Sequence, residues 1–129
     1  MPNIDRLNTL IKVTATPKHE VFQEIKGAKL VFSYTIRIEN NSDEAVQLLR
    51  RNWLITDGCV EQREVEGEGV VGETPILNPG DHFEYQSWCP LANDFGIMEG
   101  YYIFAETSEF QTFKVQIPPF LLLPFYQLN

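Results

Sequence analysis

The most constraining feature of the sequence is a nine-residue run in which large apolar side chains alternate with mostly smaller or polar ones. The run is LVFSYTIRI, at residues 30–38. One parity holds the large side chains Leu30, Phe32, Tyr34, Ile36 and Ile38. Because successive side chains of a β-strand point to opposite faces, this period of two predicts a long strand with one face buried. A turn is expected directly afterwards, at ENNSDE, residues 39–44.

Other segments repeat the strand pattern. Strands are expected at IKVTATP, where Pro17 ends the strand, and at AVQLLRRNWLIT, CVEQREV, HFEYQSW, GYYIFAE and FQTFKVQI. The apolar parity changes near Arg50 and Arg51, which predicts a β-bulge, and Asp57-Gly58 predicts a hairpin. No segment shows a helical apolar stripe with caps. We therefore expect seven or eight strands in an antiparallel β-sandwich, with Trp53 in its core, and a single domain over residues 1–129.

Charge and composition limit the classes of partner. The formal net charge is −8, whereas nucleic acids and anionic membranes are bound by cations, so we expect neither as a partner. The longest apolar stretch, residues 117–126, is about half the length of a membrane-spanning helix. The N-terminal residues lack a secretory signal pattern, so we expect a cytoplasmic protein with Cys59 and Cys89 reduced. Their spacing leaves a disulfide open as the other possibility.

A glycine motif lies in EGEGVVGETP, residues 66–75. Gly67, Gly69 and Gly72 form G-x-G-x-x-G, which in dinucleotide-binding proteins precedes a helix whose N-terminus binds pyrophosphate. Pro75 leaves no room for that helix, and five glutamates between positions 61 and 73 would repel a phosphate. We therefore expect the glycines to provide positive φ angles or close packing, with a pyrophosphate loop as the alternative.

Two further groups of residues suggest chemistry without completing a site. Asp81, His82 and Ser87 have the side-chain types of a catalytic triad, but adjacent residues on a strand point to opposite faces, so Asp81 is not expected to orient His82. Arg50 and Arg51 are the only adjacent basic pair and form a candidate clamp for a phosphate or carboxylate. The two histidines and two cysteines have no metal-ligand spacing. We expect no enzymatic activity, no metal and no cofactor.

Several blocks, in a fixed order, resemble the ApaG family. They are RRNWLITD, EVEGEGVVGETPILNPG, FEY, GIMEGYY and VQIPPFLL, and they extend from about residue 11 to residue 122. The resemblance implies a fibronectin type III-like sandwich of the immunoglobulin type. It also implies an association with cobalt resistance and magnesium efflux in bacteria, and a partner-binding role like that of homologous domains in F-box proteins. The family's glycine motif, proposed there as a pyrophosphate site, corresponds to Gly67, Gly69 and Gly72.

The chain departs from the family pattern at two places. Asn52 stands before Trp53, where the family commonly has histidine. YQSWC, residues 85–89, replaces the family's usual Y-T-S-G and places the bulky Trp88 beside a loop that is usually small.

The aromatic side chains point to a partner surface. Nine Phe, five Tyr and two Trp exceed what strand alternation would bury in a small core, and Trp88, Phe120 and Phe125 are the candidates for exposure. We therefore expect a non-enzymatic interaction domain that binds a protein partner through a sheet face or edge. It would be a monomer, or a homodimer through a sheet edge. The alternative is a nucleotide- or phosphate-binding protein that uses the glycine motif with nearby arginines.

Overall fold

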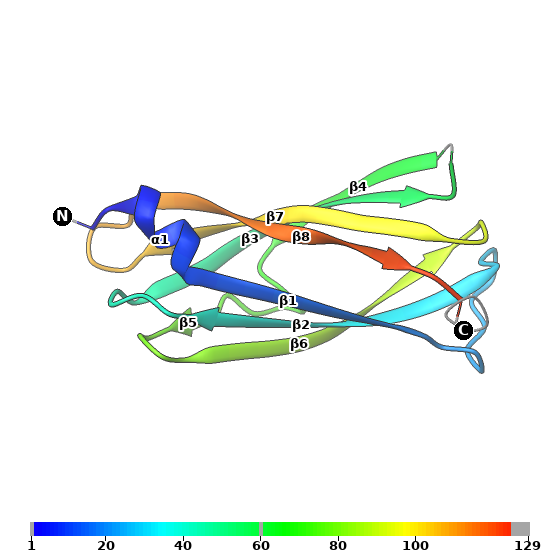
Figure 1. The fold of residues 1–129 in the computed structure, drawn as a ribbon, viewed down its shortest axis with the longest axis horizontal. Coiled ribbons are helices and arrows are strands. Elements are labelled where there is room, and N and C mark those ends of the chain that lie inside the picture. The colour runs from blue at the N-terminus through cyan, green and yellow to red at the C-terminus, as the bar shows by residue number, and fades with distance from the viewer. Residues whose placement is uncertain (1, 60, 125–129) are drawn as a thin grey trace.

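The structure is a computed structural model that describes residues 2–59 and 61–124. Within these residues a single short helix, α1 at Ile4–Leu10, precedes eight strands. The strands are β1 Ile11–His19, β2 Leu30–Asn40, β3 Val46–Asp57, β4 Glu61–Glu68, β5 Ile76–Leu77, β6 His82–Leu91, β7 Gly96–Glu106 and β8 Thr112–Leu122. They form two sheets, in the orders β1-β2-β6 and β4-β3-β7-β8, and β5 adds to β3 (Figure 1). Every strand pair is antiparallel, so the predicted antiparallel β-sandwich is confirmed.

The two long sides of the sandwich differ. On one side β1 packs beside β8, and α1 also packs against β8, as the front strands of Figure 1 show. On the other side, β6 is the edge of one sheet and β4 is the edge of the other. We call this second side the open side, because no strand within residues 2–59 and 61–124 joins the two edges there. The unequal width of the sheets leaves β4 without a facing strand.

The core follows the alternation of β2. Its predicted inward parity is buried along the whole strand, from Leu30 to Ile38. Trp53 is 2% exposed and packs its ring against Tyr34 and Tyr102, so the prediction of a core tryptophan is confirmed. Phe120 belongs to the same aromatic cluster, with ring centroids 5.9 Å from both Tyr34 and Trp53. Phe120 is only partly buried against the core, so a role in a partner surface stays a prediction for this side chain.

The predicted irregularities of β3 are present. The register between β3 and β7 shifts between Leu48 and Arg50, which confirms the β-bulge. The bulge lets the apolar residues before and after it share the buried face, since Leu48 and Trp53 are both in the core. The hairpin at Asp57-Gly58 is also confirmed, because β3 and β4 pair from Asp57 to Glu68, and Gly58 has a φ of +71°.

Two local predictions are wrong. β1 continues through Pro17 to His19, because β1 is an edge strand and an edge tolerates a residue without an N–H donor. A helix also forms where none was expected. Asn3 caps it by accepting hydrogen bonds from the amides of Asp5 and Arg6, at 3.1 and 3.3 Å. α1 has seven residues, too few for an apolar stripe to be recognised, and no helix among the described residues could cross a membrane.

Candidate binding cleft

The glycine loop, residues 67–72, begins in the last two residues of β4 and leads to the segment before β5. Gly69 and Gly72 have φ angles of +65° and +81°, as expected for glycines that serve backbone geometry. The amide of Val70 donates to the carbonyl of Glu73 at 2.8 Å, and the amide of Glu73 donates back to the carbonyl of Val70 at 2.9 Å. These two bonds close a tight turn with Val71 and Gly72 at its centre. The two-residue strand β5 follows, so no helix N-terminus adjoins the loop.

Arg51 ties the glycine loop to β3. Its Nη1 donates to the backbone carbonyls of Glu68 and Gly69, at 3.1 and 2.9 Å. Gly67 lies against the same guanidinium, since a Cβ at this position would come 3.1 Å from both Nη atoms. The loop thus presents carbonyl oxygens to an arginine, and the amide of Gly69 is already bonded to the carbonyl of Leu49. Pyrophosphate binding at this loop stays a prediction.

A cleft of about 450 Å³ opens between the edges of the two sheets. We call it the open-side cleft, and the residues that define it are Tyr34, Arg51, Trp53, Val65, Ser87 and Trp88. Trp88 on β6 is 48% exposed and Val65 on β4 is 38% exposed. Ile25, from the segment between β1 and β2, also lines the cleft and is 42% exposed. The volume lies within the range of small-ligand pockets, and these side chains make the mouth apolar.

One wall of the cleft is held by a buried carboxylate. Asp57, 1% exposed, accepts hydrogen bonds from the amides of Ala92 and Asn93, at 2.8 and 3.0 Å, and pairs with Arg63 at 3.2 Å. Arg63 also donates to the carbonyl of Pro90 at 2.6 Å. Burial raises the pKa of Asp57, but these hydrogen bonds outweigh it and hold the pKa below its usual value. The network joins the β3–β4 hairpin to the end of β6.

The remaining predicted site residues separate in the structure. Arg50 is exposed and does not line the cleft, whereas Arg51 does, because consecutive strand residues point to opposite faces. The structure therefore brings only Arg51 to the cleft, and a joint clamp by the two arginines stays a prediction. Trp88 is exposed as predicted, and Phe125 lies outside the described residues.

A triad does not form either. His82 and Ser87 are five positions apart on β6, on opposite faces and roughly 17 Å apart along the strand. Within residues 2–59 and 61–124, no group of three or more His, Cys, Asp or Glu side chains could hold a metal ion.

Sequence reasoning missed the part that Tyr34, Ser87 and Ile25 play in the cleft. Tyr34 and Ser87 are opposite each other in the register of β2 and β6, a pairing between distant segments that no local pattern reports. For Arg63 and Val65 a signal existed: they share a parity on β4 that places both on the cleft side.

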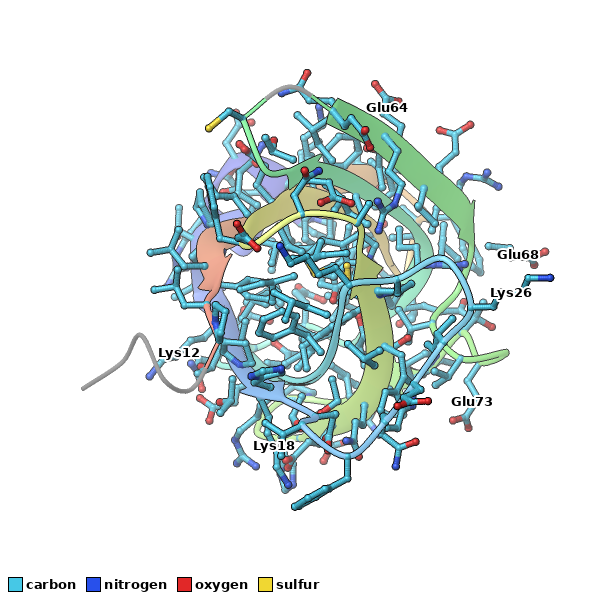
Figure 2. The ribbon with its side chains drawn as sticks, turned by 90° about the vertical axis from the view of Figure 1, so that its right-hand side faces the viewer. Lys12, Lys18, Lys26, Glu64, Glu68 and Glu73 are labelled. Atoms are coloured by element: carbon cyan, nitrogen blue, oxygen red, sulfur yellow. The ribbon has the colours of Figure 1, made fainter. Side chains whose placement is uncertain are left out.

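The opposite parity of β4 is acidic. Glu64, Glu66 and Glu68 alternate with the cleft-facing residues and point to the outer surface of the sheet. Figure 2 shows Glu64, Glu68 and Glu73 on the same side of the molecule as Lys26, and Lys12 and Lys18 on the side of β1. The open side therefore carries a negative outer face next to a cleft that contains cations.

Comparison with known proteins gives a consistent picture. The ApaG domain profile matches residues 21–106. The Protein ApaG of Mesorhizobium japonicum is 50% identical over 94 residues, 73% of this chain and 72% of that protein. The Protein ApaG of Azorhizobium caulinodans is 46% identical over 114 residues, 87% of this chain and 86% of that protein.

Solved structures agree. The crystal structure of the putative ApaA protein from Bordetella pertussis is 40% identical, with a TM-score of 0.81 over 88% of this chain and 92% of that one. An X-ray structure of a structural-genomics target is 37% identical, with a TM-score of 0.85 over 92% of this chain and 90% of that one. Since the profile covers well over half of the sequence and the relatives align along most of it, the chain belongs to the ApaG family.

Proposed function

We propose that this chain is a non-enzymatic binding module that holds an extended segment of a protein partner along β4. The observation that carries the proposal is the character of β4 as an edge strand. Among the described residues it pairs with β3 on one side only, so backbone N–H and C=O groups on its other side are open to pairing with an added strand. The partner strand would lie across the mouth of the open-side cleft.

The two faces of β4 specify the chemistry of the partner. Side chains of an added strand that point to the cleft would meet Val65, Trp88 and Ile25, which are exposed and apolar. Side chains that point to the outer face would meet Glu64, Glu66 and Glu68. Because strand side chains alternate, a matching segment alternates apolar residues with lysine or arginine.

A protective role for the glutamates is the competing interpretation. Charged residues on edge strands commonly prevent association between sheet edges. Protection alone does not account for the apolar side chains of Trp88, Val65 and Ile25, which are exposed together at one cleft. This grouping favours a surface that is covered in the complex.

The proposal extends to the other expectations of partner and location. The net charge of −8 argues against nucleic acid and anionic membranes as partners. We propose that any contribution of the chain to cobalt resistance or magnesium efflux is made through the bound protein, in the cytoplasm.

Selection from a library of random displayed peptides tests the proposal. The selected peptides should alternate apolar and basic residues, and their affinity should fall as salt rises, because the outer-face contacts are ion pairs near water. Val65→Lys should weaken binding by about tenfold or more, since it places a charge on the apolar side of the added strand. Leu121→Lys is the matched control, because Leu121 is 51% exposed on β8, which lies away from the open side.

Two results would contradict the proposal. One is a set of selected peptides without alternation whose binding is equally sensitive to Val65→Lys and Leu121→Lys. The other is a stable homodimer that dissociates in Val65→Lys, because the occupant of β4 would then be a second copy of the chain.

A further inference from the structure

The inner end of the open-side cleft contains an arginine without an acidic partner. Arg51 is half-buried and forms no ion pair with a carboxylate of the described residues. The contrast is Arg63 in the same cleft, whose charge is matched by Asp57 at 3.2 Å. Removing a charge from water costs free energy unless an opposite charge compensates, so an unmatched guanidinium is a ready site for an anion.

The position of Arg51 is fixed by the protein. Its Nη1 is held by the carbonyls of Glu68 and Gly69, and Gly67 packs against the guanidinium with no side chain in between. Five N–H donors exist on a guanidinium, and these two carbonyls occupy Nη1 alone. The remaining donors are therefore pre-oriented, which lowers the entropy cost of binding a planar anion.

Hydroxyl groups gather around the same arginine. Tyr34 and Ser87 line the cleft, and behind them the hydroxyls of Tyr85 and Tyr102 are 2.5 Å apart. Burial raises the pKa of all three tyrosines, and the nearby positive charge of Arg51 lowers each by a smaller amount. The tyrosines thus stay protonated at neutral pH. A hydrogen bond with Ser87 lowers the pKa of Tyr34, so the Tyr34 oxygen accepts there and its O–H remains as a second donor to an anion beside Arg51.

The rest of the cleft is suited to an uncharged tail. Ile25, Val65 and Trp88 surround the mouth, and Ile55 and Met98 lie deeper. The cleft volume of about 450 Å³ is sufficient for a phenyl ring or a branched aliphatic group together with a carboxylate.

Charge favours a monoanion. Glu61 and Lys26 both line the cleft and offset each other, and Glu64, Glu66 and Glu68 are on the adjacent outer face, so a dianion would meet more repulsion than a single charge. A carboxylate also matches the planar fork of the guanidinium with two parallel hydrogen bonds.

We propose that the open-side cleft is a binding site for a carboxylate with an aromatic or branched aliphatic tail, with the carboxylate at Arg51 and Tyr34 and the tail against Trp88, Val65 and Ile25. Two sources offer this chemistry: a free organic acid, and the C-terminal residue of a protein chain. The site goes beyond strand addition on β4, because it needs no free strand edge.

Titration followed by NMR chemical shifts tests the site without a variant. The probes are phenylacetate for a free acid and N-acetylphenylalanine for a chain terminus. Phenylacetamide, which keeps the tail and removes the charge, is the control. We expect an acid to shift the NMR resonances of Arg51, Tyr34 and Trp88. Phenylacetamide should bind about 10- to 100-fold more weakly than phenylacetate, because it cannot form a hydrogen bond between opposite charges. Binding of phenylacetate assigns a free acid, and binding of N-acetylphenylalanine alone assigns a chain terminus.

Matched variants locate the charge. Arg51→Gln should abolish the preference for acid over amide, whereas Arg50→Gln should leave it unchanged, because Arg50 is adjacent in sequence but does not line the cleft. Tyr34→Phe should weaken binding of the acids by a smaller factor than Arg51→Gln does, and it leaves the contacts of Arg51 with the glycine loop intact.

Three results would overturn the inference. They are equal binding of phenylacetate and phenylacetamide, acid-induced shifts outside the cleft, and tighter binding of phenyl phosphate than of phenylacetate. The peptide selection described above is independent of these titrations. Failure of the β4 partner with a retained acid preference would therefore remove the proposed function and leave the acid site.

Discussion

Replacing Gly69 by alanine tests why the loop between β4 and β5 contains glycines. Gly69 has a φ of +65°, and a Cβ added there would come 2.3 Å from the backbone carbonyl oxygen of Glu73 and 3.0 Å from its carbon. The contact cannot be relieved by a side-chain rotation, because both atoms belong to the backbone. The Glu73 carbonyl is also the acceptor of the Val70 amide, so moving it disturbs the turn.

Gly72 supplies the matched comparison. It has a φ of +81°, but a Cβ there would meet no atom of the described residues within 4 Å. Gly72→Ala therefore carries only the cost of a left-handed L-residue, about 1–2 kcal/mol. Gly69→Ala carries that cost plus a steric clash, for which overpacking gives about 1–3 kcal/mol more. The loss of unfolded-state entropy is the same in both variants and cancels in their difference.

Urea unfolding of the wild type and both variants measures these free energies. We expect the free energy of unfolding to fall by about 2–5 kcal/mol in Gly69→Ala and by about 1–2 kcal/mol in Gly72→Ala. Equal effects of the two substitutions would refute the reasoning from backbone contact. Melting in millimolar ATP, against matched salt, tests the alternative role: we expect no shift in the wild type, and a raised midpoint would support a nucleotide at the loop.

Four further predictions follow from single sites. Trp53→Ala should lower the free energy of unfolding by about 3–5 kcal/mol in the same urea assay, because it empties the centre of the aromatic cluster; an unchanged midpoint would contradict the core assignment. Val71→Gly should raise the urea midpoint of unfolding. Val71 is a β-branched residue at a φ of +43°, and because its side chain is 55% exposed, the relief of backbone strain exceeds the packing that is lost. The pKa of Asp57 is lowered in the folded state, so the ionised carboxylate stabilises the fold above about pH 4, and this contribution is lost as pH falls through the folded pKa. The Asp57→Asn variant should be less stable than the wild type at pH 7, and its free energy of unfolding should fall less on acidification. Without reductant, a thiol reagent should label only the exposed Cys59 in the native protein, because burial raises the pKa of Cys89 to about 11, and it should label both cysteines after denaturation. Two rapidly labelled thiols in the native state would contradict the burial of Cys89.

Several features could be predicted from local sequence because they depend on local chemistry. The alternation of residues 30–38, the parity change that makes the β3 bulge and the turn signal at Gly58 each act within a few residues. The positive φ angles of Gly69 and Gly72 belong to the same class. The capped helix α1 was not recognised, because seven residues are too few for a periodic pattern.

The candidate site depended on contacts between distant segments. Phe120 and Trp88 are both large aromatic residues on strands, yet packing between the sheets places Phe120 partly buried against the core and leaves Trp88 about half exposed at the open side. Arg50 and Arg51 are equivalent in sequence, and only the facing of β3 decides which one enters the cleft.

The sequence by itself determined the strands, their turns and the family, because apolar alternation, turn-forming residues and spaced motifs can each be recognised from the order of residues alone. The tertiary structure alone decided that a three-strand sheet covers a wider one, and that β4 and β6 end as free edges with a cleft between them. The physical reason is that sheet order and facing follow from pairing and packing between residues far apart in sequence, such as Tyr34 with Ser87.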